Sequence, residues 1–367
     1  MPVERLAIVG TGLIGASLGL AARRAGAGAV VGWDEDVSAL ATAAERGAVD
    51  TGAASLAEAV ADADLVVVAV PVAALPEAVA GVLAATGERT TVTDVGSTKA
   101  AVCAAAGASE RFIGGHPVCG SEARGPANAG PDLFAGATWF LTPLARTEPA
   151  RYEALHRFIV ALGAVPTAVD PDAHDRIVAL TSHLPHALAN LLLNQVGSNR
   201  IEGHEALAAA GGSLRDMTRV AGANPRIWVD IMLANAAPLL EAVADHRRRL
   251  DQLERALAEG DAGFLARWIG EAAENRRRML AMAHPDVGAL QQLRVHVPDR
   301  PGVLAGITQA LGAERINIEE FALEHVSPER GGTLRLLVAG SERAERAAAV
   351  LEAQGYAVVV SPVVTEP

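Results

Sequence analysis

The amino-acid sequence predicts a three-part protein: a doubly wound α/β domain, an all-helical domain and a small βαββαβ domain. Three observations predict it. Short apolar runs alternate with helical patterns up to residue 170, long helical periodicity fills 171–288, and strand patterns return after residue 290. We therefore expect domains at residues 1–170, 171–288 and 290–367.

The first domain is predicted from seven short apolar runs. Several of them show little polar alternation, as parallel strands buried on both faces do. Helical patterns such as 73–85 and 148–162 separate them, which gives a βαβ rhythm. The runs are Leu6–Val9, Ala29–Trp33, Leu65–Val70, Thr90–Val95, Phe112–Gly114, Thr138–Leu141 and Val165–Val169.

A glycine-rich turn directly follows the first run and opens a helical pattern. The first glycine permits a tight turn, the second lets the backbone approach a pyrophosphate, and the third lets the helix pack closely on the sheet. The helix N-terminus offers unpaired N–H groups to phosphates. This context predicts a dinucleotide-binding Rossmann domain; the alternative is a structural turn without a ligand. The residues are Gly10, Thr11, Gly12, Leu13, Ile14 and Gly15.

Asp34 ends the second run, where a carboxylate accepts hydrogen bonds from ribose hydroxyls and repels a 2′-phosphate. We therefore expect NAD rather than NADP as the cofactor. A solvent-exposed turn aspartate is the alternative. Four residues that follow later strands are also expected at the cofactor, namely Val70, Pro71, Asp94 and Gly96.

His116 follows two glycines at the end of another expected strand. A histidine at this rim can act as the general base that hydride transfer from an alcohol carbon requires. Ser97 lies in a neighbouring rim loop and is expected to hydrogen-bond both His116 and the substrate. The alternatives are a structural histidine and, for Ser97, an N-cap for a helix from Thr98 onward.

The second domain is predicted to be all-α, because four long stretches have helical apolar periodicity and none resembles a strand. Its helices are rich in Ala and Leu, so we expect broad apolar faces that pair with a second copy in a homodimer. The stretches are 174–197, 203–220, 225–257 and 261–284.

Two polar patches mark the helical domain. His183 and His186 lie three residues apart on one helical face; we expect substrate contact from His186 and a core or capping role for His183. No metal is expected, because a third ligand at a familiar spacing is missing.

Arg215 and Arg219 form the second patch. They are four residues apart and are expected on one helix face, where two guanidinium groups suit a substrate with carboxylates. The alternative is a solvated face with pairing by Asp216. Gly212 belongs to the same expected substrate site, and Trp228 either lines the pocket or packs in the core.

The third domain is predicted from strands at Leu293–Val297, Ile316–Glu324, Thr333–Ala339 and Ala357–Val360 and from helices at 303–311 and 342–354. This βαββαβ order is ferredoxin-like.

Composition indicates the cellular location of the protein and argues against some classes of partner. A formal net charge of −12 argues against a nucleic-acid partner. The two cysteines do not form a disulfide framework and indicate a cytoplasmic protein. We expect no targeting segment and no membrane partner, because no run of about 18 apolar residues occurs.

The chain resembles the prephenate/arogenate dehydrogenase family of tyrosine biosynthesis over nearly its whole length. The resemblance implies that His116 is the catalytic histidine and that Ser97 positions it and the nicotinamide. It implies that Arg219 clamps the ring carboxylate and that His186 faces the substrate side chain. The motifs are Gly10–Gly15, Asp94–Lys99, His116–Glu122, Ser182–His186, Gly211–Arg219 and Pro225–Trp228.

The same resemblance implies roles for four more residues. Glu122 and Asp216 resemble members of an ionic network that closes the pocket. Arg215 stands where some relatives carry Lys, so the charge is kept but the donor geometry differs. Trp228 is implied to approach the site of the partner subunit.

The last domain resembles an ACT domain, a regulatory module that binds amino acids. Asp299–Leu304 and Ile316–Ile318 carry this resemblance. It implies feedback by L-tyrosine at a dimer interface, with Gly302 and Asn317 near the ligand. A purely structural or dimerising role is the alternative.

The expected reaction is the NAD-dependent oxidative decarboxylation of prephenate to 4-hydroxyphenylpyruvate and CO2. The first alternative is the same chemistry on arogenate. The second is a non-catalytic sensor that binds NAD and an amino acid. The presence of both a general base and a carboxylate clamp argues against this sensor. A 3-hydroxy-acid dehydrogenase is disfavoured, because it normally has a catalytic lysine in its helical domain and this chain has none there.

Overall fold

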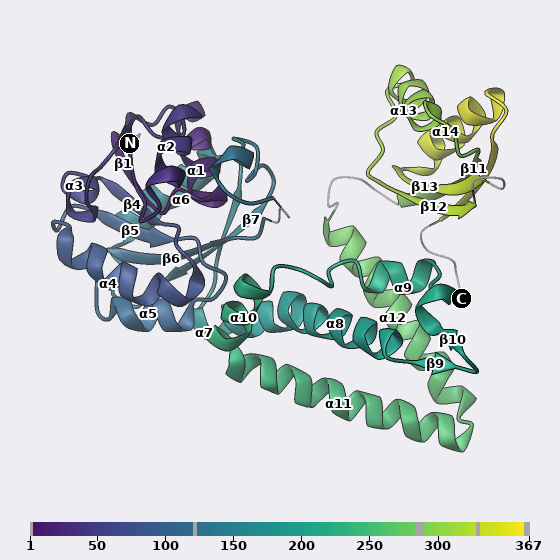
Figure 1. Ribbon diagram of the computed structural model, residues 1–367. Helices are drawn as coiled ribbons and strands as arrows, with labels where there is room; N and C mark the ends of the chain where they lie inside the picture. The colour runs from purple at the N-terminus through teal and green to yellow at the C-terminus, as the bar shows by residue number, and fades with distance from the viewer. Residues whose placement is uncertain (1–2, 120–122, 284–289, 328–330, 363–367) are drawn as a thin grey trace. The chain divides into compact units, whose positions relative to one another are not determined.

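The computed structural model describes residues 3–119, 123–283, 290–327 and 331–362. It divides into two compact units, residues 1–247 and 248–367, which are described in turn (Figure 1).

The first unit contains an eight-stranded sheet in the order β3-β2-β1-β4-β5-β6-β7-β8. Every neighbouring pair is parallel except β6 and β7, which run antiparallel. All seven expected strands are confirmed; the two-residue β3 is too short to leave a periodic signal. The strands are β1 (Arg5–Val9), β2 (Ala29–Trp33), β3 (Thr51–Gly52), β4 (Leu65–Val68), β5 (Thr91–Asp94), β6 (Phe112–Pro117), β7 (Thr138–Pro143) and β8 (Val165–Ala168).

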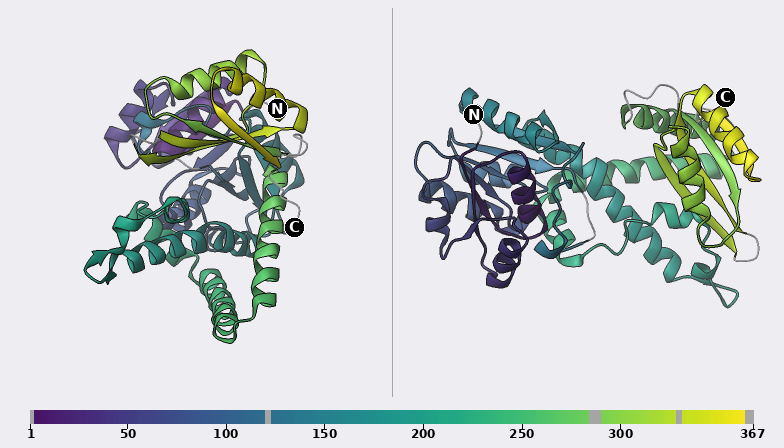
Figure 2. Two further views of the ribbon diagram at one scale, coloured as in Figure 1. Left: turned by 90° about the vertical axis from the view of Figure 1, so that its right-hand side faces the viewer. Right: turned by 90° about the horizontal axis from the view of Figure 1, so that it is seen from above.

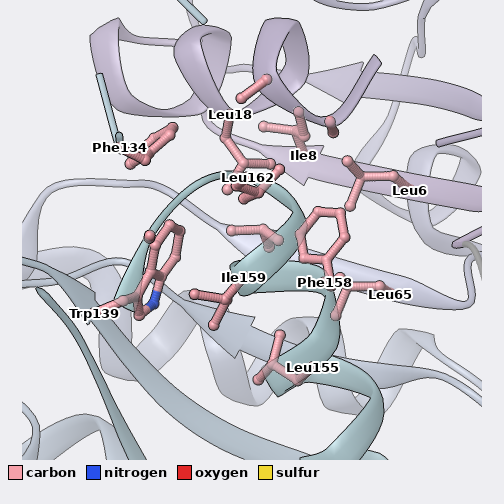
Figure 3. Packing of buried hydrophobic residues seen from close by; sticks show 14 of the residues in the cluster. Leu6, Ile8, Leu18, Leu65, Phe134, Trp139, Leu155, Phe158, Ile159 and Leu162 are labelled. Atoms are coloured by element: carbon pink, nitrogen blue, oxygen red, sulfur yellow. The ribbon is translucent and has the colours of Figure 1, made fainter. Parts of the chain in front are cut away.

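Helices cover both faces of this sheet, because alternate residues of the central strands are apolar in both directions. Leu6 and Ile8 of β1 pack in a cluster with α1 and α6, whereas Ala7 and Val9 pack in another with α3, α4 and α5. Figure 3 shows the first cluster, with Phe158 and Leu162 beside β1. The helices are α1 (Leu13–Arg24), α2 (Val37–Glu45), α3 (Leu56–Val60), α4 (Leu75–Ala85), α5 (Ala100–Ala106) and α6 (Pro149–Ala161).

The strand order reverses between β1 and β4, which is where doubly wound sheets bind ligands. The four neighbouring strands β1, β4, β5 and β6 are parallel, so their carboxyl ends share one edge. This edge collects the glycine turn, the loops after β4 and β5, and His116 near the end of β6.

The segment after the sheet is mainly helical, as expected. Its helices are α7 (Pro171–Val178), α8 (Leu184–Gly197), α9 (Gly212–Met217), α10 (Pro225–Ala234) and α11 (Ala236–Glu259), with a π turn at Ala179–His183 between α7 and α8. α12 (Ala262–Ala283) belongs to the second unit. The expected domain limits stay a prediction, since the division at residue 247 falls inside α11.

The expectation of continuous helix over 203–220 is wrong. A two-stranded ribbon of β9 (Arg200–Ile201) and β10 (His204–Glu205) precedes a 3-10 turn and the six-residue α9. Glu202 and Gly203 both have positive φ, at 51° and 85°, the backbone of a tight hairpin turn. Glu-Gly is a weaker hairpin signal than Asn-Gly, which is why the sequence pattern favoured a helix.

Several large apolar side chains on this helical segment are exposed in the single chain. They include Leu191, Ile227, Leu233, Leu240 and Val243.

No single helix in the described ranges is long and apolar enough to cross a membrane. α10 and α11 satisfy a test of length and composition only when they are taken together, and an 88° bend separates them.

The second unit ends in a four-stranded antiparallel sheet in the order β12-β13-β11-β14. Figure 2 shows α13 and α14 on one face of this sheet, and its core joins Leu293 and Val295 to Ile307 and Leu351. The expected βαββαβ order is confirmed. The elements are β11 (Leu290–Val297), α13 (Val303–Ala313), β12 (Glu320–Ser327), β13 (Gly331–Ala339), α14 (Ser341–Ala353) and β14 (Ala357–Pro362).

Candidate active site at the carboxyl edge of the sheet

The glycine turn has the geometry that the sequence predicts. Gly10 has φ +93°, and a Cβ built on Gly15 lies 1.9 Å from the carbonyl oxygen of Gly10, so neither position accepts a side chain. A Cβ on Gly12 has nothing within 4 Å, which leaves its backbone open to an approaching group. The first turn of α1 carries no acidic side chain and Gly12 provides no side-chain cap, so its amide groups suit a pyrophosphate.

Asp34 follows β2 and faces the same turn. Its Oδ2 accepts hydrogen bonds from Thr11 N at 2.6 Å and Thr11 Oγ1 at 3.0 Å, and its Oδ1 accepts one from Asp36 N at 2.9 Å. A carboxylate offers about four lone-pair sites. One site on Oδ1 therefore remains for a ribose hydroxyl, and the residues present fit NAD.

Asp94 is fully buried, and both of its carboxylate oxygens are engaged. Oδ2 accepts from Gly96 N at 2.8 Å and forms an ion pair with Lys99, while Oδ1 accepts from Gly115 N at 3.0 Å. This side chain ties the loop after β5 to β6. Contacts of Asp94, Gly96, Val70 and Pro71 with the cofactor stay a prediction.

Ser97 does not cap the next helix. α5 begins at Ala100, two residues later than the N-cap alternative requires, since that alternative starts the helix at Thr98. The carboxylate of Asp175, on α7, accepts hydrogen bonds from Lys99 N at 2.7 Å and Ala100 N at 2.8 Å. A cap from a distant residue leaves no periodic signal in the local sequence, so the pattern alone could not place the helix start.

His116 is partly exposed on β6, and its Nδ1 lies 2.9 Å from Nε2 of His174. Nδ1 of the fully buried His174 in turn lies 2.8 Å from Oδ1 of Asp175. Among the described residues no hydrogen bond joins Ser97 to His116. Sequence reasoning missed His174 and Asp175; the signal it had was an adjacent His-Asp pair in the first helix after the sheet.

The environment of His116 favours the neutral imidazole. Burial lowers the pKa of His116 well below 6.5, and the neighbouring His174, Lys99 and His183 lower it further. A neutral ring is the form that accepts a proton, so the electrostatics suit a general base.

His186 and His183 have different surroundings. His183 is buried, its Nδ1 lies 2.9 Å from Nδ2 of Asn235, and burial lowers its pKa to about 4, which agrees with the expected core role. His186 is partly exposed, donates from Nδ1 to the carbonyl oxygen of Ser182 at 2.9 Å and stacks on Trp228. Trp228 therefore meets a site residue of its own chain, and its implied approach to a partner subunit stays a prediction.

The arginine patch differs from the expected helix face. α9 ends at Met217, and Arg219 lies in the turn that follows it, so Arg215 and Arg219 do not share a helical face. The hydroxyl of Thr218 donates to Leu214 O at the helix end, and Gly222 has positive φ soon after. Burial lowers the pKa of His186, and the hydrogen bond to Ser182 raises it in part. The positive charge of Arg219 lowers this pKa further, so Arg219 disfavours protonation of the His186 ring.

Other expected site residues are placed as follows. Gly212 and Asp216 are exposed on α9. Glu122 lies outside the described residues. Gly302 is the left-handed residue before α13, and Nδ2 of Asn317 donates to Glu319 at 2.9 Å, both in the second unit. Within the described ranges no group of three or more His, Cys, Asp or Glu side chains has a metal-holding arrangement.

Three family profiles match the chain in succession. "Prephenate dehydrogenase, nucleotide-binding domain" matches residues 18–167, "Prephenate dehydrogenase, dimerization domain" matches 170–271 and "ACT domain" matches 291–355. Among curated proteins, prephenate dehydrogenase of Bacillus subtilis is 31% identical over 362 residues, covering 96% of this chain and 96% of its own length.

Two solved structures extend the comparison. Arogenate dehydrogenase of Synechocystis superposes with a TM-score of 0.69 at 29% identity, covering 75% of this chain and 100% of that one. Prephenate dehydrogenase of A. aeolicus, solved with hydroxyphenyl propionate and NAD+, superposes with a TM-score of 0.70 at 28% identity, covering 76% and 99%.

The matches span the sheet, the helical segment and the C-terminal domain. They agree with the fold and with a turn built for a dinucleotide. The chain belongs to the prephenate dehydrogenase family, and is an oxidoreductase with an NAD-binding domain, a dimerisation domain and an ACT domain.

Proposed function

We propose that this chain catalyses the NAD-dependent oxidative decarboxylation of prephenate to 4-hydroxyphenylpyruvate and CO2. The observation that carries the proposal is the position of His116, a neutral imidazole at the carboxyl edge of the sheet, on the same edge as the glycine turn. The match to prephenate dehydrogenase of Bacillus subtilis over 96% of the chain supports the substrate.

His116 accepts the proton of the substrate C4 hydroxyl while the C4–H bond gives up its hydride. NAD, when bound, supplies the hydride acceptor. Loss of the ring carboxylate as CO2 leaves its bonding electrons in the ring, which becomes aromatic, and His116 returns the proton to the phenol oxygen. The protein contributes position and charge control, as is usual when a cofactor carries the redox chemistry.

Substrate binding is assigned to the α8–α10 region. Arg219 pairs with the ring carboxylate, and His186, held by Ser182 and stacked on Trp228, faces the pyruvyl side chain. Arg215, Gly212, Asp216 and Glu122 complete the expected pocket. The loss of carboxylate charge during the reaction weakens the Arg219 pair in the product and so favours release.

The experiment offers the purified chain NAD with prephenate or arogenate and follows NADH formation. Turnover with prephenate well above that with arogenate supports the proposal. Turnover mainly with arogenate would leave His116 as the general base but would contradict the assignment of His186 to the pyruvyl side chain. This second activity is carried as a candidate because the Synechocystis neighbour is an arogenate dehydrogenase.

The regulatory part of the proposal assigns L-tyrosine to the ACT domain, near Gly302 and Asn317, in a homodimer. The exposed apolar side chains of the helical segment support the dimer. Size-exclusion chromatography with light scattering tests the dimer, and rates with and without L-tyrosine test the effector. A fully active monomer would contradict the homodimer. Rates that L-tyrosine leaves unchanged would contradict its role as an effector.

A further inference from the structure

We propose that His174 and Asp175 act as a positioning pair that fixes the tautomer of His116 with hydrogen on Nδ1 and a free lone pair on Nε2. The inference deepens the proposed function and rests on it for the role of His116. It rests on a chain of hydrogen bonds whose direction is set at one end by backbone amides.

The chain of bonds begins at the N-terminus of α5. Lys99 N and Ala100 N can only donate, and they point to Oδ1 and Oδ2 of Asp175 at 2.7 and 2.8 Å. Burial raises the pKa of Asp175, but the bonds from His174 and the two amides outweigh it, and the net pKa lies below 3.8. Asp175 is therefore a carboxylate at neutral pH and has only acceptors to offer.

The carboxylate decides the protonation of His174. Its Nδ1, 2.8 Å from Oδ1 of Asp175, must carry hydrogen. In the neutral ring Nε2 then has a lone pair and no proton. Because Nδ1 of His116 lies 2.9 Å from this Nε2, His116 must donate from Nδ1. Nε2 of His116 therefore keeps its lone pair, and this is the nitrogen that can accept the proton of a substrate hydroxyl.

Packing holds the rings in this arrangement. The side chain of His174 has no exposed surface. Its ring meets Phe140 edge-on, with centroids 5.2 Å apart at 82°, and meets His116 at 5.1 Å and 74°. Phe140 is the cross-strand partner of His116 on β7, so one aromatic ring supports both histidines. The rotation that would exchange the two nitrogens of His174 is thereby opposed.

The arrangement also serves the reaction. When Nε2 of His116 takes the substrate proton, Nδ1–H keeps its acceptor, and the negative charge of Asp175 lies one ring away. The carboxylate-held imidazole of hydrolase triads orients its base by the same logic, with one ring fewer. His174 and Asp175 do not touch the substrate in this account; they act through His116.

The first test measures the tautomers directly in the full-length chain. Long-range ¹H–¹⁵N correlation spectra of protein labelled at histidine distinguish Nδ1–H from Nε2–H rings, and the variants H116N and H174Q assign the signals. At pH 7.5 we expect both His116 and His174 as Nδ1–H tautomers. An Nε2–H ring at His116 would overturn the inference, whether or not the chain turns over prephenate.

The second test separates positioning from folding with two variants at one position. In H174Q the carboxamide can still accept from Nδ1 of His116, whereas in H174F the ring shape is kept and the acceptor is lost. We expect H174F to lower kcat by about 10- to 100-fold with little change in KM, the range for partners that orient a functional group. H174Q should retain most of kcat, and the exposed H204Q serves as the matched control.

NAD binding and thermal unfolding of each variant show whether it folds. Equal kcat in H174F and wild type, or equal loss in H174F and H174Q, would overturn the positioning role. If the chain turns over neither prephenate nor arogenate, the proposed function fails while the spectra still decide the tautomers. The two failures are therefore distinguishable.

Discussion

The indole of Trp228 lies against the imidazole of His186, with ring centroids 3.5 Å apart and planes inclined by 25°. Because Nδ1 of His186 also donates to Ser182 O, the ring is held from two sides. The stack joins α10 to α8. A side chain that orients a substrate contact in this way should affect binding more than chemistry.

Trp228→Ala should raise KM for prephenate by up to about tenfold and change kcat less, since an aromatic stack contributes about 0.5–1.5 kcal/mol. Initial rates over a range of prephenate concentrations measure this. Trp268→Ala, an exposed tryptophan on α12, is the control. A large fall in kcat at unchanged KM would contradict the assignment to substrate binding.

His116 should keep the enzyme active in mildly acidic solution. Burial, followed by the neighbouring His174, Lys99 and His183, lowers its pKa well below 6.5, so the base stays unprotonated as the pH falls through 6.5 and loses function only at lower pH. The acidic limb of kcat/KM against pH reports this group. A limb above pH 6.5 would be incompatible with the lowered pKa.

His116→Asn should lower turnover by roughly 10²–10⁴-fold, the range for a lost general base. His204→Asn, on the exposed ribbon, should leave turnover unchanged. Single-turnover rates with saturating prephenate and NAD separate this effect from binding. Unchanged turnover in H116N would remove His116 from the mechanism.

His183 should make stability depend on pH. Its folded pKa is about 4, whereas the unfolded ring protonates near 6.5, so the unfolded state binds more protons between these values. This favours unfolding as the pH falls, by about 2 kcal/mol between pH 7 and pH 5. Calorimetry of wild type and His183→Gln should show a smaller pH dependence in the variant, whatever its absolute stability; equal dependence would refute the prediction.

Arg219→Ala should chiefly raise KM for prephenate, by about 10- to 100-fold, because a hydrogen bond to a charged group contributes about 1.5–3 kcal/mol. Arg219→Lys should recover part of this, since it keeps the charge but not the planar fork. Arg226→Ala, also exposed and on the adjacent α10, is the matched control. Kinetics near wild type in R219A would exclude the clamp.

Asn317→Ala in the full-length chain should weaken the response to L-tyrosine without changing the rate in its absence. Asn317 is exposed in the second unit, where it bonds only locally to Glu319 among the contacts described above. Gln354→Ala, at the end of α14, is the control. A tyrosine effect that persists in N317A at the same concentration would place the effector elsewhere.

The sequence predicted the sheet well because buried parallel strands are continuous apolar runs, and the glycine turn well because its geometry demands glycine. Gly15 shows this: its position leaves no room for a Cβ beside Gly10. The ribbon of β9 and β10 was missed because its turn uses Glu202, whose positive φ leaves no periodic signal in the sequence.

The partners of site residues were less predictable, because they come from distant parts of the chain. The cap of α5 is Asp175, which lies 75 residues beyond Ala100. The bond of His116 likewise reaches His174 across 58 residues. Such pairings depend on how α7 packs on the sheet, and single-sequence patterns describe local preference rather than packing.

Lys99 is the only lysine in the sequence, and its side chain is completely buried in the ion pair with Asp94. The folded chain therefore shields its one ε-amine from acylating reagents. Covalent labelling of that amine requires the loop between β5 and α5 to open, so its labelling rate reports the free energy of this local opening. A built-in chemical probe of this kind needs no engineered residue, and it follows the very loop that carries Ser97.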